Sequence, residues 1–149
     1  MPSEIRIRQL KASDTDLATL TEDLNSDDWT DFEYPFTTES LRNFLEDDSH
    51  IYLIALVDNE LAGALHAYAM YHPSGRVHFY IDEVDTKKQF RRKGVASAMM
   101  QEALKIAGAR GYDEAWLGTE HDNEPAKALY TSLNPSEVEE GPIYSWKTK

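Results

Sequence analysis

The sequence predicts an α/β protein of the α+β type, in which helices flank one mixed sheet. Three observations indicate this fold. Apolar and polar residues alternate from Glu4 to Leu10, as they do in a half-buried strand. Apolar residues recur every three to four positions from Val95 to Arg110, as they do on one face of a helix. Two apolar runs, Ile51–Val57 and Leu61–Tyr71, flank the turn residues Asp58–Glu60, as expected of a hairpin.

The elements before this hairpin are one strand and two helices. The strand covers Glu4–Leu10, and Ser13 or Asp14 can cap the first helix after it. The apolar face of that helix carries three leucines, which are Leu17, Leu20 and Leu24. A second helix is predicted to begin around Thr37 and to bury Leu41 and Leu45.

After the hairpin, a turn at His72–Gly75 leads into a strand over Arg76–Thr86. Apolar residues of this strand have even spacing from Val77 to Ile81, and the spacing slips at Val84. Such a slip indicates that the strand contains one extra residue. We therefore predict a β-bulge near Asp82 and Glu83.

The helix over Val95–Arg110 is predicted to end at Gly111, where a left-handed residue is favoured. A strand at Ala115–Thr119 and a short helix at Glu124–Leu133 follow. The tail from Glu137 to Lys147 is predicted to form a final pair of strands. The complete expected order is β-α-α-β-β-β-α-β-α-β-β, with one strand-loop-helix unit leading to a parallel neighbour.

Composition excludes several classes of function. The 149 residues contain no cysteine, so disulfides, zinc–thiolate sites and thiol nucleophiles are excluded. The net charge of −12 disfavours nucleic acid and anionic membranes as partners. The chain has no secretory signal pattern and no apolar run of about 20 residues. We expect one domain over residues 1–149, located in the cytoplasm.

One segment departs from the acidic character of the chain. Five of the 15 basic residues lie within positions 87–93, and no acidic residue occurs from Thr86 to Gln101. A helix is predicted to begin here beside Gly94, and its first amides and its dipole favour an anion. The pattern predicts a diphosphate site, although a solvated basic loop is the alternative. Neither GxxxxGK[ST] nor GxGxxG occurs, which excludes a P-loop and a Rossmann site.

Two motifs resemble the GNAT superfamily of N-acetyltransferases. The segment Gln89–Ala96 is similar to its Gln/Arg-x-x-Gly-x-Gly/Ala signature, with Arg91, Gly94 and Ala96 at the defining positions. Asn123–Tyr130 resembles its Asn-x-x-Ala-x-x-Leu-Tyr helix. The predicted order of elements also matches this family, but Leu133-Asn134-Pro135 departs from its usual Leu-Gly-Phe.

The resemblance implies that acetyl-CoA is the co-substrate. Backbone groups at the end of the bulged strand would bind the pantetheine arm, and helix amides would bind the pyrophosphate. The implied set is Val84, Asp85, Thr86, Arg91, Arg92, Lys93, Gly94, Val95, Ala96, Ser97 and Asn123. Thr86 stands where the family usually has valine. Tyr130 is the implied general acid that protonates the CoA thiolate.

The resemblance also implies direct transfer, in which an amine attacks the thioester without an acyl-enzyme intermediate. A carboxylate would help to deprotonate the amine, whose pKa is about 10 in water. Glu83 is the first candidate because it lies at the predicted bulge, and Asp82 and Glu120 are alternatives. Each of the three is otherwise a surface or salt-bridge carboxylate.

Acceptor specificity is expected from the segment Ser26–Phe36, where carboxylates and aromatic residues alternate. Its candidate contacts to a cationic acceptor are Trp29, Asp31, Glu33 and Tyr34. The alternative is a loop that holds its aromatic residues in the core. Three other stretches resemble aminoglycoside 3-N-acetyltransferases, which implies a polycationic acceptor; they are Leu61–Tyr68, Phe90–Ala98 and Glu124–Thr131.

The expected function is therefore acetyl transfer to a primary amine of a small cationic molecule such as an aminoglycoside or a polyamine. Acetylation of a protein N-terminus or lysine is the alternative within enzymes. A non-catalytic acetyl-CoA-binding module is the alternative outside them. The family implies a homodimer, and no metal is expected.

Overall fold

The computed structural model of the chain describes residues 4–30, 32 and 34–149. Its elements are β1 (Ile5–Gln9), α1 (Leu17–Leu24), α2 (Thr38–Leu45), β2 (His50–Val57), β3 (Glu60–Tyr71), β4 (Val77–Thr86), the 3₁₀ turn η1 (Lys88–Phe90), α3 (Val95–Ala109), β5 (Glu114–Trp116) and α4 (Glu124–Ser132). They divide into two compact units, Met1–Gly118 and Thr119–Lys149. Within the described part of the chain, no helix combines the length and the apolar character that crossing a membrane requires.

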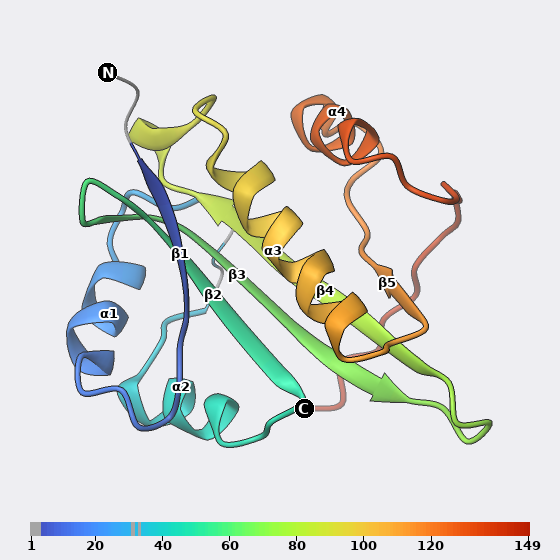
Figure 1. The fold of residues 1–149 in the computed structure, drawn as a ribbon, viewed down its shortest axis with the longest axis horizontal. Coiled ribbons are helices and arrows are strands. Elements are labelled where there is room, and N and C mark those ends of the chain that lie inside the picture. Colours follow the sequence, from blue (N-terminus) through green and yellow to red (C-terminus); the bar gives the residue numbers. More distant parts are fainter. Residues whose placement is uncertain (1–3, 31, 33) are drawn as a thin grey trace. The chain divides into compact units, whose positions relative to one another are not determined.

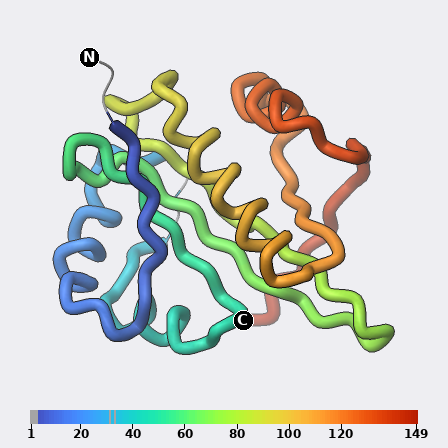
Figure 2. Tube along the Cα trace, in the orientation of Figure 1, coloured from blue at the N-terminus to red at the C-terminus, as the bar shows by residue number. Residues whose placement is uncertain are grey.

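The five strands of the first unit form one sheet in the order β1-β2-β3-β4-β5. The first four strands are antiparallel to their neighbours, and β5 is parallel to β4. Figure 2 shows the chain running back and forth through β2, β3 and β4 before α3 returns it to β5. The predicted mixed sheet, its central hairpin and its parallel crossover are therefore confirmed.

The two faces of the sheet are covered by different helices. The helix α3 lies over one face (Figure 1), where a Cβ atom at Gly63 would touch Val95 and Met99. Adjacent strand residues point to opposite faces, and Ala64 belongs to a core cluster that contains Leu17 of α1 and Leu41 of α2. α1 and α2 therefore cover the other face, and Tyr52 and Ile54 of β2 point into the core between that face and the helices.

Gly63 allows α3 to approach the sheet closely. A Cβ atom there would lie 2.7 Å from Val95 Cγ1 and 2.8 Å from Met99 Cε. We expect Gly63→Ala to lower the free energy of unfolding by about 1–3 kcal/mol, because overpacking forces side chains and backbone to shift. Urea denaturation measures this loss.

A second glycine of the same unit provides the control. Gly108 lies inside α3, and a Cβ atom there would meet nothing within 4 Å. Gly108→Ala should therefore raise stability by about 0.5–1 kcal/mol, since alanine favours the helix. Equal effects of the two substitutions would show that Gly63 does not limit the packing of α3.

The helix caps confirm one prediction and correct another. Thr37 and Ser40 form a reciprocal capping box at the start of α2, with hydrogen bonds of 2.9 and 3.1 Å. The N-cap of α1 is Asp16, and neither Ser13 nor Asp14 caps this helix. The carboxylates of Asp14 and Asp16 bind Arg8 of β1 instead, at 3.0 and 2.7 Å.

The final pair of strands predicted from Glu137 to Lys147 is wrong. Residues 134–149 contain neither helix nor strand, and all of them are exposed. Their large apolar side chains remain in solvent, with Ile143 91% and Trp146 80% exposed. Apolar and polar residues alternate here, but the apolar side chains are not buried against any other element. Pro142 also has no amide N–H for pairing with another strand.

Candidate functional site

The basic segment after β4 contains two lysines that bind other parts of the protein and three cationic residues that are exposed to solvent. Lys87 is buried, and its ammonium group lies 2.8 Å from Asp23 Oδ1 and 5.7 Å from the centre of the Trp29 ring. Lys88 donates a hydrogen bond of 3.1 Å to the carbonyl of Asp27. These two lysines hold the segment that follows α1. The charge available to an anionic ligand therefore comes from Arg91, Arg92 and Lys93, which are exposed.

The start of α3 has the geometry of an anion site. Gly94 is its N-cap at φ 82°, no side chain caps the helix, and Arg92 also has a positive φ of 62°. The first amides of a helix have no acceptor within it, and the helix dipole makes this end positive. The amides of Val95, Ala96 and Ser97 therefore have no acceptor within the helix and can bind an anion.

The end of β4 continues beyond its pairing with β5. Their described pairing covers only His78–Tyr80, so the segment Val84–Thr86 continues beyond it. The carboxylate of Asp85 is buried and accepts hydrogen bonds from the amides of Thr30 and Thr86, at 3.1 and 2.8 Å. The Thr86 amide is used by its bond to Asp85, so a backbone contact from Thr86 to a ligand would come from its carbonyl.

The β-bulge predicted near Asp82 and Glu83 is confirmed. His66 pairs with Glu83 whereas Ala67 pairs with Ile81, so Asp82 is the extra residue of β4. His66 Nε2 lies 3.3 Å from Asp82 Oδ2 and 3.8 Å from Glu83 Oε1. Two consecutive carboxylates therefore face the same imidazole.

The electrostatics of this bulge involve histidine and tyrosine side chains. Burial lowers the pKa of His66, although the nearby Asp82 carboxylate opposes that effect. Burial and the same carboxylate raise the pKa of Tyr68 to about 12 and also raise that of Tyr80. Tyr68 donates a hydrogen bond of 3.3 Å to Asp82. The directions of these pKa shifts favour the neutral form of His66 and the protonated form of both tyrosines.

Tyr52 lies beside the bulge on β2, directly opposite His66. Its ring stacks on the imidazole with centroids 6.0 Å apart. Burial raises the pKa of Tyr52, and the charges of Glu83 and Asp85 raise it further. Among the described residues, its hydroxyl has no hydrogen-bond partner.

The segment between α1 and α2 places its aromatic residues mainly in the core. Trp29 is 8% exposed, donates to the carbonyl of Asp23 at 3.0 Å, and contacts Phe32 at a centroid distance of 5.0 Å. These contacts match the alternative in which the loop anchors its aromatic residues. Tyr34 is 80% exposed, and the predicted acceptor contacts Asp31 and Glu33 lie outside the described residues.

Two predicted residues belong to the second unit. The side chain of Asn123 caps α4 by accepting a hydrogen bond of 3.2 Å from the amide of Ala126. Tyr130 lies two turns later on the same helix and is half-buried. Their approach to the acetyl-CoA loop remains a prediction from the motif.

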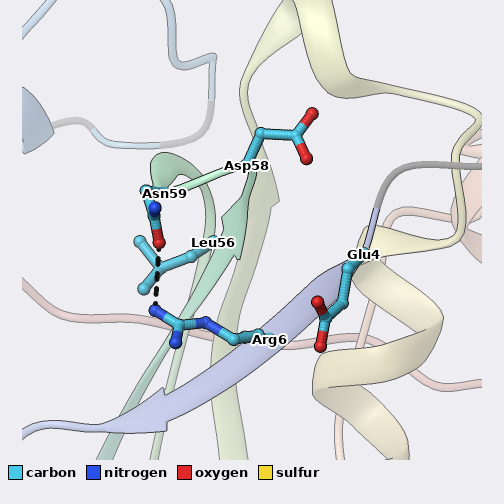
Figure 3. Close-up of a pocket in the computed structure, with 5 residues that line it drawn as sticks. All are labelled: Glu4, Arg6, Leu56, Asp58 and Asn59. Carbon is cyan, nitrogen blue, oxygen red and sulfur yellow. Dashed lines mark hydrogen bonds between the residues drawn. The ribbon is translucent and has the colours of Figure 1, made fainter.

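A surface hollow on the edge strand β1 contains none of the predicted site residues. Its lining comprises Glu4, Arg6, Leu56, Asp58 and Asn59, and Arg6 donates to Asn59 Oδ1 at 3.2 Å (Figure 3). The guanidinium of Arg6 is thus held by the β2–β3 turn. We assign no ligand to this hollow.

Sequence reasoning did not select His66 or Tyr52 as site residues. A signal was present in the register of the sheet. The turn at His72–Gly75 aligns β3 with β4, and counting back from it brings His66 beside the predicted bulge. The tight turn at Asp58 and Asn59 then brings Tyr52 beside His66.

Comparisons with known proteins agree with this geometry. The model of the acetyltransferase (GNAT) family matches residues 21–134. The chain is 28% identical over 103 residues to N-alpha-acetyltransferase 30 of Schizosaccharomyces pombe, a match that covers 69% of each protein.

Similar solved structures include aminoglycoside acetyltransferases. One from an uncultured soil metagenomic sample is 29% identical, with a TM-score of 0.72 and coverage of 96% of this chain and 99% of that one. Another from such a sample, crystallised with sisomicin, has a TM-score of 0.80 at 17% identity and covers 97% of both chains. The latter similarity establishes the fold alone.

Proposed function

This chain belongs to the GNAT family of acetyltransferases, and from that premise we propose that it moves an acetyl group from acetyl-CoA directly to a primary amine of a small cationic acceptor. One observation carries the donor half of this proposal. The N-terminus of α3 has no side-chain cap, begins at Gly94, and follows the end of β4, which extends beyond its pairing with β5. These features fit a pyrophosphate joined to an arm that extends along the strand.

The chain's own residues divide the binding of acetyl-CoA. The amides of Val95, Ala96 and Ser97 bind the pyrophosphate, and Arg92 and Lys93 add positive charge. Backbone groups of Val84, Asp85 and Thr86 bind the pantetheine arm, with Asn123 as a further contact. Arg91 donates a hydrogen bond of 2.6 Å to Thr30 Oγ1, so it also links this loop to the segment that precedes α2.

Two side chains move protons in the proposed reaction. Glu83 accepts a proton from the acceptor's ammonium group, which leaves a neutral amine able to attack the thioester carbonyl. A C–N bond forms and the C–S bond breaks. Tyr130 donates its proton to the departing thiolate and regains one from the new amide nitrogen, so the products are the N-acetyl amide and free CoA.

The acceptor is proposed to be small and cationic because Asp82 and Glu83 both lie beside His66 at the bulge and the chain carries a net charge of −12. Similarity to an aminoglycoside acetyltransferase at 29% identity supports this choice. A protein N-terminus is the second candidate, supported by similarity to an N-alpha-acetyltransferase. Cytoplasmic location and homodimer formation remain predictions from the sequence.

Thermal denaturation with acetyl-CoA tests the donor half. A ligand at 100 times its Kd stabilises a protein by about 2.7 kcal/mol, which raises the Tm by several degrees in a chain of this size. Acetylated pantetheine lacks the pyrophosphate and should give a smaller shift. Absence of a shift at millimolar acetyl-CoA would refute the co-substrate assignment.

Thiol release from acetyl-CoA then identifies the acceptor. We expect spermidine and aminoglycosides to be acetylated faster than neutral amino acids or peptides with a free N-terminus. A preference for peptides would transfer the proposal to protein N-terminal acetylation.

A further inference from the structure

The end of α1 and the residues after it are joined to the basic segment at several points. Asp23 Oδ1 lies 2.8 Å from the buried ammonium group of Lys87. Lys88 donates two hydrogen bonds, one of 3.0 Å from its amide to the carbonyl of Asp28 and one of 3.1 Å from its side chain to the carbonyl of Asp27. The basic segment that precedes the donor site therefore lies directly against the segment from which acceptor specificity is expected.

Thr30 makes a further contact, through both its backbone and its side chain. Its amide donates a hydrogen bond of 3.1 Å to Asp85 Oδ2 at the end of β4. Its hydroxyl oxygen lies 3.5 Å from Asp85 Oδ1 and accepts a hydrogen bond of 2.6 Å from the guanidinium of Arg91. Asp85 is buried, whereas Thr30 and Arg91 are exposed. Thr30 thus connects a fixed point of the sheet to a cation that a ligand can reach.

Arg91 can bind Thr30 and a phosphate group at the same time. Its guanidinium carries five N–H donors in a rigid fork, and one of its nitrogens donates to Thr30. Guanidinium groups bind phosphate oxygens through short, charge-assisted and frequently bidentate hydrogen bonds. Arg91 precedes Gly94, the N-cap of α3, where the donor's pyrophosphate is proposed to bind. A bound pyrophosphate would fix the guanidinium and, through it, the Thr30 hydroxyl.

We propose that Thr30 is a positioning residue through which acetyl-CoA, bound at the start of α3, orders residues 23–30. The inference rests on the proposed function, because it requires the donor to bind beside Gly94. Residues 23–30 lead into the segment expected to select the acceptor, so donor binding prepares the acceptor side of the site. Coupling between two sites is reciprocal. The ordered state of residues 23–30 therefore strengthens the binding of acetyl-CoA by the same factor.

Hydrogen–deuterium exchange with and without CoA, read on peptides that cover residues 23–30, tests this coupling without turnover. In the wild type, we expect CoA to slow exchange of these amides at least fivefold. Thr30→Val removes the hydroxyl but keeps the amide and the branched shape, and CoA should then slow exchange less than twofold.

Two further variants make the exchange result specific to the Thr30 hydroxyl. Thr30→Ser keeps the hydroxyl and should give the wild-type response to CoA. Thr19→Val makes the same chemical change at an exposed position of α1 and should also respond like the wild type. Thr30→Val should retain a Tm shift at saturating acetyl-CoA, because reciprocity limits its loss of affinity to the coupling factor.

The response to CoA, as distinct from the exchange rate itself, separates coupling from a purely structural role. If Thr30 only stabilises its own segment, Thr30→Val will exchange faster in both states and CoA will still slow exchange by the wild-type factor. That result would overturn the proposal, as would a wild type in which residues 23–30 do not respond to CoA. The Tm shift with acetyl-CoA reports separately on the proposed function, so a retained shift alongside either result would refute the coupling alone.

Discussion

Replacing Glu83 with glutamine is expected to lower kcat by about 100-fold or more and to leave the acceptor KM within about threefold. General base catalysis typically contributes 10²–10⁴-fold to a rate, and glutamine keeps the shape of the side chain but cannot accept the proton. The carboxylate of Asp82 is still present at the bulge in this variant, so binding of the acceptor is expected to change little. Thiol release at saturating acetyl-CoA measures both constants.

Matched substitutions make this result specific to Glu83. Glu60→Gln makes the same chemical change at the exposed start of β3 and should leave kcat unchanged. Tyr130→Phe should also lower kcat, at least tenfold, through loss of the proton given to the thiolate. If Glu83→Gln retains activity and Glu120→Gln loses it, then Glu120 is the base and the assignment to the bulge is wrong.

The sheet was predictable because its sequence follows simple periodic rules. Alternation and turn residues predicted β1 to β4 to within about one residue of the observed bounds. The slip in spacing between Ile81 and Val84 predicted the bulge, because an extra residue must disturb a period of two. The caps of α1 were less predictable, since Asp14 and Asp16 bind Arg8 through tertiary contacts.

In the tail and in the basic segment, sequence patterns alone did not predict the structure correctly. Apolar residues in the tail suggested strands, but Val138 and Ile143 are exposed, and alternation forms a strand only where a partner and a buried face exist. The cluster of positive charge was counted as one feature. Tertiary structure divides it, because Lys87 is paired inside the protein while Arg92 is exposed.

Residues of the candidate site that belong to local sequence motifs were predicted, and residues brought together only by pairing between strands were missed. Gly94 was identified because a helix start requires particular residues. Tyr52 and His66 lie near the bulge only because of strand register. Tyr52 pairs with His66, which is 14 positions away, and His66 pairs with Glu83, which is 17 positions away.

The pair formed by Lys87 and Asp23 leads to the second large effect. The ammonium group of Lys87 is 2.8 Å from the carboxylate, and the side chain of Lys87 is only 4% exposed whereas that of Asp23 is 34% exposed. We expect Asp23→Asn to lower the free energy of unfolding by about 3 kcal/mol, because it leaves a buried charge without its counter-ion. Guanidinium chloride denaturation measures the loss.

The reverse substitution is expected to be milder. Lys87→Met keeps most of the length of the side chain and removes its charge, and the carboxylate of Asp23 that remains can still reach water. We therefore expect a loss of less than about 1.5 kcal/mol, as for volume-conserving changes in a core. The double variant should be more stable than Asp23→Asn alone, since position 87 then holds no buried charge without a counter-ion. Equal losses from the two single substitutions would mean that solvent screens Lys87, and its position beneath Trp29 would then have no electrostatic role.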